Sequence, residues 1–261
     1  MPSLPRTPIL VLFSLHIASA FFLSIYFYNR PLPLTTPRKI TTTRTLSFSC
    51  TANSTSKSLS IVNPNSHISD PDSISIKLLK SEIGGLKDEE ILAKFLKGFF
   101  SGWSFLPERT YLGALGLMGR TFIPVGFTDV QTGGPLLPSP NDLSKTKLPE
   151  KYSKLFHGNF MVLDVKIRDQ DPKNLDEKSE ESLESYVDIA FGDDRKGFAG
   201  FHRLEVSRDE ESGEGGTTLC YSSIACNPSV KKFPMPRILF SFHRWYGMCL
   251  FRDGVEMVLR K

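Results

Sequence analysis

The sequence predicts an α+β domain in which a curved antiparallel sheet holds a long C-terminal helix in its concave face. Two observations predict it. Four strand-like segments follow one another between residues 156 and 228, and the last three are separated by short connections rich in Asp, Gly and Ser. Such connections join neighbouring antiparallel strands. The chain then ends in a segment, residues 235–261, with apolar side chains at helical spacing.

The sequence of the first half of the domain predicts one strand, one helix and a long loop. The segment SISIKLL, residues 73–79, alternates polar with apolar side chains, as a strand does. Residues 86–103 place three acids in the first helical turn, which the helix dipole favours, and then repeat an apolar residue every fourth position (Ile91, Phe95, Phe99 and Trp103). Residues 132–149 are rich in Pro and Gly and predict a loop.

The four strands of the second half are predicted at residues 156–167, 186–192, 198–208 and 217–228. An acidic segment, residues 169–185, lies between the first two and is typical of a solvated loop. Gly197 and Gly200 stand at the start of the third strand, where a bulge or sharp bend would curl the sheet.

The final helix is long enough to lie across a whole sheet. Pro236 suits its first turn, and the helical spacing is carried by Leu239, Phe242, Tyr246, Cys249 and Leu250. At 1.5 Å per residue its length would be roughly 37 Å.

Charge is distributed unevenly along the chain. Up to Ser69 there are six basic residues and no acid, whereas from Asp70 onward acids slightly outnumber bases, so the net charge of +4 belongs to the N-terminal part. A domain without excess positive charge does not present the basic surface that binds nucleic acid.

The N-terminal part has the composition of a targeting leader. Residues 8–28 are apolar and uncharged, and residues 30–60 are rich in Ser and Thr, carry Arg and Lys, and contain SCTA at 49–52, which resembles a plastid processing site. We therefore predict a cleavable chloroplast leader over residues 1–60, a linker over 61–72 and a single domain over 73–261. Two alternatives stay open: a retained membrane anchor at 8–28, and a secretory signal cleaved after ASA at 18–20.

The cysteines predict a reducing compartment. Of the four, Cys220, Cys226 and Cys249 are expected to be buried free thiols, because their spacing fits neither a CxxC motif nor a disulfide scaffold. Cys220 and Cys226 lie too far apart along one extended strand to form a bridge.

Three stretches of the second half carry a resemblance: GFAGFHRLEV at 197–206, LCYSSIACNPS at 219–229 and HRWYGMCLFRDG at 243–254. Together they resemble an uncharacterised plant and bacterial family that is distantly related to the START-like superfamily of polyketide cyclases and lipid-transfer proteins. The resemblance covers about residues 191–261. It implies a helix-grip fold and brings no established catalytic residues with it.

Alternation along the third strand assigns its polar residues to two faces. His202 falls on the same face as Leu204 and Val206, while Arg203 and Glu205 fall on the other, outer face. On that outer face, Arg203 and Glu205 are expected to form ordinary cross-strand ion pairs worth only a few tenths of a kcal/mol.

Four residues are candidates for binding a ligand between sheet and helix: His202, Tyr221, Trp245 and Tyr246. The competing interpretation is that each simply packs in the core. Trp245 and Tyr246 are adjacent, so a helix points them about 100° apart, and only one can face the sheet while the other faces its rim.

The favoured function is non-catalytic binding of a small apolar ligand, such as a lipid, an isoprenoid or a pigment-like molecule. One alternative is a membrane-associated scaffold or assembly factor that uses residues 103–127 and the proline-rich loop. A second is a cyclase-type enzyme, by analogy of fold alone. No catalytic, metal or cofactor motif is recognisable, and the glycines at 113, 116 and 119 lack dinucleotide-loop spacing. The expected partners are a small apolar ligand and, through residues 8–28, a membrane; no nucleic acid is expected and no protein partner is indicated.

Overall fold

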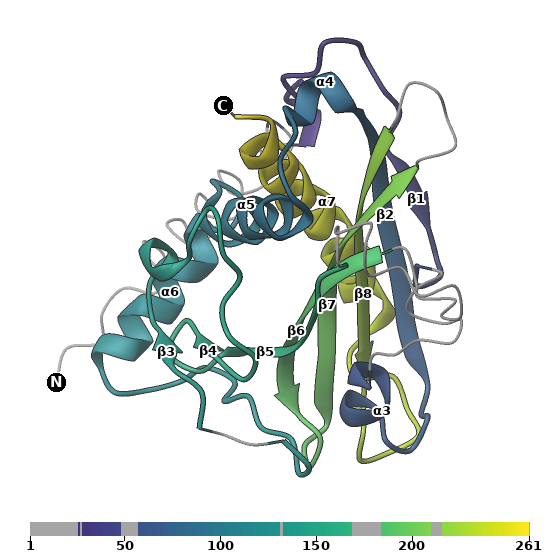
Figure 1. Cartoon of the computed structure of the whole chain (residues 1–261). Coiled ribbons are helices and arrows are strands. Elements are labelled where there is room, and N and C mark those ends of the chain that lie inside the picture. Colours follow the sequence, from purple (N-terminus) through teal and green to yellow (C-terminus); the bar gives the residue numbers. More distant parts are fainter. Residues whose placement is uncertain are drawn as a thin grey trace, which may run out of the picture.

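The structure is a computed structural model that describes residues 26, 28–47, 57–130, 133–168, 184–209 and 216–260. Within these residues, eight strands form one curved sheet in the order β1-β2-β8-β7-β6-β5-β4-β3, antiparallel except for the β3–β4 pair (Figure 1). The strands are β1 (Thr41–Thr43), β2 (Ser69–Leu79), β3 (Leu136–Leu137), β4 (Lys154–Leu155), β5 (Phe160–Lys166), β6 (Glu184–Asp193), β7 (Phe198–Asp209) and β8 (Gly216–Cys226).

Helices cover both faces of this sheet. The long helices α5 (Asp88–Ser101) and α7 (Arg237–Leu259) pack on the concave face, with α6 (Leu106–Leu117) beside α5, whereas the short α3 (Ser58–Val62) lies against β6 and β7 on the other face (Figure 1). A further turn, α4 (Lys80–Ile83), follows β2, and a 3₁₀ turn at Pro140–Asp142 lies within the proline-rich segment. The predicted α+β class, antiparallel sheet and C-terminal helix are confirmed.

The contact between α5 and α7 depends on two glycines. A Cβ atom on Gly98 would lie 2.8 Å from the Cα of Gly254, and one on Gly254 would overlap the Phe95 ring. The missing side chains therefore let the two helices cross at very close range, and Phe95 meets Phe251 edge-on at 5.7 Å between ring centroids. This contact explains why the sequence retains Gly254 inside α7, where glycine weakens an isolated helix.

Several predicted boundaries differ from the structure. β2 begins at Ser69, inside the predicted linker, because it pairs with β8 along its whole length. Trp103 is 60 % exposed, although it was expected on the buried face of the helix, because α5 ends at Ser101. Leu239 and Phe242 are likewise exposed, since the first part of α7 buries Phe240 instead.

The prediction of a bulge or sharp bend near Gly200 is wrong. The registers of β7 with β6 and with β8 run without interruption across Gly200, whereas the pairing of β5 with β6 shifts register between Val162 and Asp164. A side chain at Gly200 would collide with the Phe191 ring and the Ile224 carbonyl. The glycine thus serves close packing against the next strand rather than a bend.

Arg203 corrects a second expectation. It lies on the outer face as predicted, but its side chain is only 1 % exposed and forms a two-point ion pair with Asp188 on β6, with N–O distances of 2.7 and 2.8 Å. The guanidinium also sits 3.9 Å from the centre of the Tyr186 ring. The outer face is covered by a second apolar cluster that includes Leu46, Val62 and Phe127, so this pair is buried rather than solvated.

We expect Arg203→Met to lower the free energy of unfolding by about 3–5 kcal/mol, because it removes the guanidinium that compensates the charge of the buried Asp188 carboxylate. The matched control is Lys77→Met, which breaks the exposed Lys77–Asp209 pair and is expected to cost less than about 1 kcal/mol. Urea unfolding of the two variants measures the difference. Equal losses would contradict the assignment of Arg203 to a buried pair.

Residues 28–47, which fall within the predicted leader, contact the domain. β1 pairs with β2, and the Glu82 carboxylate pairs with Arg38 and accepts hydrogen bonds from Thr35. Farther along, the backbone N–H of Ser47 donates to Ser222 Oγ at 3.1 Å and its hydroxyl to Glu205 Oε2 at 3.0 Å. Whether residues 1–60 are removed stays a prediction, and residues 8–25 lie outside the described part of the chain.

A chain that begins at Lys57 is expected to unfold at a temperature at least about 5 °C below that of a chain beginning at Tyr26. The shorter chain removes the hydrogen bonds of Thr35 with Glu82 and of Ser47 with Glu205, and the buried side chain of Leu46, a loss of about 2 kcal/mol or more. Thermal unfolding followed by circular dichroism tests this expectation. Identical midpoints would mean that residues 28–47 do not stabilise the fold.

Candidate functional site

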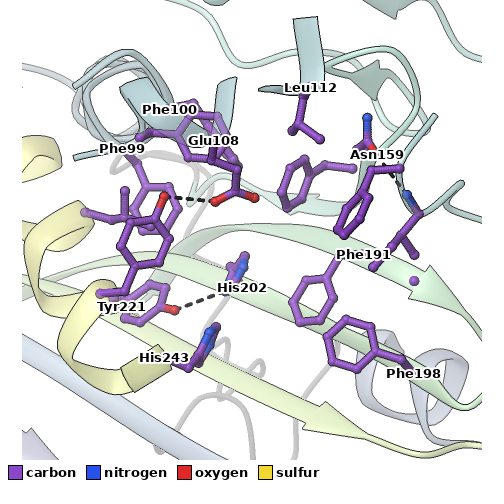
Figure 2. A pocket seen from close by; sticks show the side chains of 18 residues that line it. Phe99, Phe100, Glu108, Leu112, Asn159, Phe191, Phe198, His202, Tyr221 and His243 are labelled. Atoms are coloured by element: carbon purple, nitrogen blue, oxygen red, sulfur yellow. Dashed lines mark hydrogen bonds between the residues drawn. The ribbon is translucent and has the colours of Figure 1, made fainter. Parts of the chain in front are cut away.

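A cavity of about 240 Å³ lies between the concave face of the sheet and the helices (Figure 2). Its walls come from α5, α6 and α7 and from β5 to β8. Most of the wall is aromatic, and the phenylalanines that line it are Phe99, Phe100, Phe105, Phe122, Phe160, Phe191 and Phe198. The sequence builds this wall by placing one apolar side chain per helical turn on α5 and on alternate positions of the strands.

The first cluster of polar side chains in the cavity consists of His202 and Tyr221. The Tyr221 hydroxyl lies 3.0 Å from Nδ1 of His202, and both side chains are buried. Burial, together with the neighbouring His243, lowers the pKa of His202 well below its usual value, so the imidazole is neutral near pH 7. Burial also raises the pKa of Tyr221 far above its usual value.

His243 of α7 extends this group. Its ring stacks on that of His202, with centroids 5.9 Å apart, and its Nε2 lies 3.2 Å from the Ser223 hydroxyl. Burial lowers the pKa of His243 as well. Two neutral imidazoles therefore lie together on the floor of the cavity.

A second polar group comes from two helices. The Tyr246 hydroxyl of α7 donates a hydrogen bond to Glu108 Oε2 of α6 at 2.8 Å, and Figure 2 shows the carboxyl pointing into the cavity. Burial raises the pKa of Glu108 above its usual value, an effect that outweighs the opposing hydrogen bond from Tyr246. The shift favours the neutral carboxylic acid over the carboxylate.

The structure brings three of the four candidate residues together. His202, Tyr221 and Tyr246 all line the cavity. Trp245 does not: it lines a separate, more polar hollow of about 420 Å³ between β1, β2 and the outer side of α7, together with Tyr28, Arg44, Asp72 and Arg244. The helical angle between adjacent residues accounts for this separation, as the sequence predicted for the pair.

Glu108, His243 and Asn159 are cavity residues that the sequence analysis missed. Glu108 sits in the first turn of α6, where an acid is explained by the helix dipole alone. His243 lies one helical turn before Tyr246 and Gly247, so its placement follows once that face of α7 is known to meet the sheet. Asn159 is held by its own hydrogen bonds with Ile123 and Phe156.

Two features were sought among the described residues: a cluster of metal-ligating side chains and a helix that could span a membrane. No group of three or more His, Cys, Asp or Glu side chains there could hold a metal ion. Among the same residues, no helix combines the length and the apolar character needed to cross a bilayer. Cys220, Cys226 and Cys249 are buried free thiols, as predicted.

Comparisons of the chain with protein-family models, with curated proteins and with solved structures found no match. The resemblance to the START-like superfamily therefore stays a prediction, and the interpretation of the cavity depends on its geometry.

Asp72 of β2 lies near Tyr221 and Ser223 and is only 3 % exposed. It faces Ser223 across the β2–β8 register, and its carboxyl has no hydrogen-bond partner among the described residues. Burial raises its pKa to about 7, opposed by Arg244 and reinforced by Asp70. The Arg244 guanidinium is held by Asp70 at 2.6 Å.

The raised pKa of Asp72 predicts a loss of stability as pH rises. The pKa of Asp72 is 3.8 in the unfolded chain and about 7 in the folded protein, so between these pH values the folded protein binds one more proton than the unfolded chain. The stabilisation is therefore complete below pH 3.8 and is lost as the pH rises through about 7. The loss attributable to Asp72 is on the order of 4 kcal/mol at most. Asp72→Asn is expected to remove that part of the difference in unfolding free energy between pH 4 and pH 8.

Urea unfolding at the two pH values measures this difference. Asp129→Asn, at an exposed loop position, is the control and is expected to leave the wild-type pH dependence unchanged. An equally steep dependence in Asp72→Asn would contradict the assignment.

Proposed function

We propose that this protein binds a small apolar ligand in the cavity between the sheet and α7, in a fold of the helix-grip type, without catalysing a reaction. The observation that carries the proposal is that the concave face is not filled by its own side chains: about 240 Å³ stays free inside an aromatic wall. Protein interiors are normally packed to the density of organic crystals, with few voids larger than a water molecule. An apolar cavity of such size favours an apolar occupant over water.

The volume limits the ligand. A cavity of about 150 Å³ is enough to hold benzene, whereas drug-sized ligands use about 300 Å³ or more. The observed volume lies between these values. It fits a molecule of one or two rings or a short isoprenoid, and is too small for a whole diacyl lipid.

A non-catalytic role is supported by how the polar residues are paired. The hydroxyl groups near His202 and His243 belong to Tyr221 and Ser223, and burial holds the pKa of both the histidines and Tyr221 in the direction of the neutral forms. The raised pKa of Tyr221 is opposite to the lowered pKa of an activated nucleophile, whereas a neutral histidine is also the form that acts as a base, so the support for a non-catalytic role comes from Tyr221. The cyclase-type alternative therefore continues to depend on analogy of fold alone.

We propose a chloroplast location, which is supported by the acid-free, Ser- and Thr-rich composition of residues 30–60. Retention of residues 8–28 as a membrane anchor, or secretion, are the alternatives.

The scaffold alternative has an observation of its own. Several large apolar side chains are exposed on and around α6, outside the cavity: Trp103, Tyr111, Leu117 and Met118, with Phe122 at the cavity wall. Exposed apolar groups of this kind often contact a partner. A scaffold would need this surface and not the cavity, so changes inside the cavity separate the two functions.

The decisive experiment is mass spectrometry of an organic-solvent extract of the natively purified full chain. We expect an apolar compound in the wild type, its loss in Leu112→Trp, which fills the cavity from α6, and its retention in Leu117→Trp, on the same helix but 90 % exposed. Thermal unfolding checks that both variants fold. No compound in the wild type, or equal amounts in both variants, would favour the scaffold.

A further inference from the structure

We propose that the ligand of this cavity is an uncharged ring compound carrying one oxygen function, a hydroxyl or a carbonyl, which is bound between the Glu108 carboxyl and the His202 imidazole. This inference rests on the proposed function and narrows it from apolar ligands in general to ring alcohols, phenols and cyclic ketones.

Two polar atoms that face the cavity have no hydrogen-bond partner among the described residues. Tyr246 occupies Oε2 of Glu108, which leaves Oε1 without a partner. Tyr221 occupies Nδ1 of His202, which leaves Nε2 without a partner among the described residues, although His202 is only 7 % exposed. Both residues line the same cavity, and Figure 2 shows the Glu108 carboxyl pointing into the space that His202 borders.

Both residues border the cavity, so a water molecule or an oxygen atom of a ligand there can supply the hydrogen bond that each atom lacks within the described part of the chain. The Glu108 carboxyl accepts a hydrogen bond as a carboxylate and donates one when it is protonated, and a neutral imidazole either donates or accepts at Nε2, according to whether Tyr221 donates to Nδ1 or accepts from it. A hydroxyl both donates and accepts, so it can pair with either form of Glu108. A carbonyl oxygen can accept from His202 and from protonated Glu108.

The charges around the cavity exclude ionised ligands. No lysine or arginine occurs among the described residues that line it. The pKa of Glu108 is raised and the pKa values of His202 and His243 are lowered, each chiefly by burial, so the surroundings disfavour charge on all three groups. A carboxylate, phosphate or ammonium group would lose its hydration here without gaining a counter-charge. Fatty acids and phosphorylated isoprenoids therefore do not fit.

The aromatic side chains of the cavity wall favour a flat ligand. Phe100 meets the rings of Phe105, Phe156 and Phe160 at centroid distances of 5.1 to 5.2 Å, two of them edge-on, so these rings hold one another in place. On the opposite side Phe191 packs against both Phe198 and His202. Aromatic faces and edges pack well against another ring, which loses little conformational entropy on binding.

The test compares para-ethylphenol with para-ethyltoluene, which replaces the hydroxyl by a methyl group of similar size. In isothermal titration of the full chain we expect the phenol to bind at least about tenfold more tightly, the effect of hydrogen bonds to otherwise unpaired buried groups. The carboxylate para-ethylbenzoate is expected to bind at least about tenfold more weakly than the phenol at pH 7.5.

Variants of the cavity residues test whether Glu108 causes the preference for the phenol over para-ethyltoluene. Glu108→Leu is expected to abolish the preference for the phenol while para-ethyltoluene still binds, and Tyr246→Phe, which removes the hydroxyl that positions Glu108, is expected to reduce it. Trp245→Phe, adjacent on α7 but lining the other hollow, is the control and is expected to keep the wild-type ratio.

The outcomes separate this inference from the function on which it rests. Equal affinity for the phenol and the toluene, or tight binding of the benzoate, would overturn the inference and leave binding of an apolar ligand standing. A preference that survives in Glu108→Leu would also overturn it. Failure of both neutral probes to bind would overturn the proposed function itself.

Discussion

The crossing of α5 and α7 at Gly98 and Gly254 is the constraint on which the concave face depends. It brings the backbones of the two helices into contact near the C-terminal end of α7, where Phe251 and Val255 are fully buried. Because a helix is stiff, fixing this end also fixes the direction of the other. Farther back along α7, Gly247 lies against Tyr221 and Tyr246 reaches Glu108, so the first half of α7 forms one side of the cavity instead of closing onto the sheet.

Strand β7 places two adjacent polar residues, His202 and Arg203, in opposite environments. On the outer face Arg203 stays charged, because Asp188 supplies a two-point ion pair and Tyr186 covers the guanidinium. On the concave face His202 forms no ion pair among the described residues, and burial, together with His243, favours its neutral form. One side of β7 thus contains a closed, fully paired contact, while the other leaves a hydrogen-bonding atom directed at a cavity. The first contributes to stability and specificity of the fold, and the second is available to a ligand.

Local patterns predicted much of this arrangement. Alternation along β7 correctly placed His202 with Leu204 and Val206, and the helical angle correctly separated Trp245 from Tyr246. Sequence could not tell which of these two faces the sheet, because the rotation of α7 is set by a contact with α5, more than a hundred residues away. The burial of Arg203 escaped prediction for a similar reason: the outer cluster includes Leu46 and Phe127, neither of which belongs to the sheet.

The cavity is unusual for the inside of a domain. Protein interiors are normally packed with few voids larger than a water molecule, whereas this space of about 240 Å³ is bordered mainly by aromatic and aliphatic side chains. Several of its phenylalanines pack against one another, and Glu108 and His202 border the same space. A ligand that occupies the space buries its own apolar surface against these rings and can pair with both polar side chains at once, which is the physical reason to regard the cavity as a site and not as a packing defect.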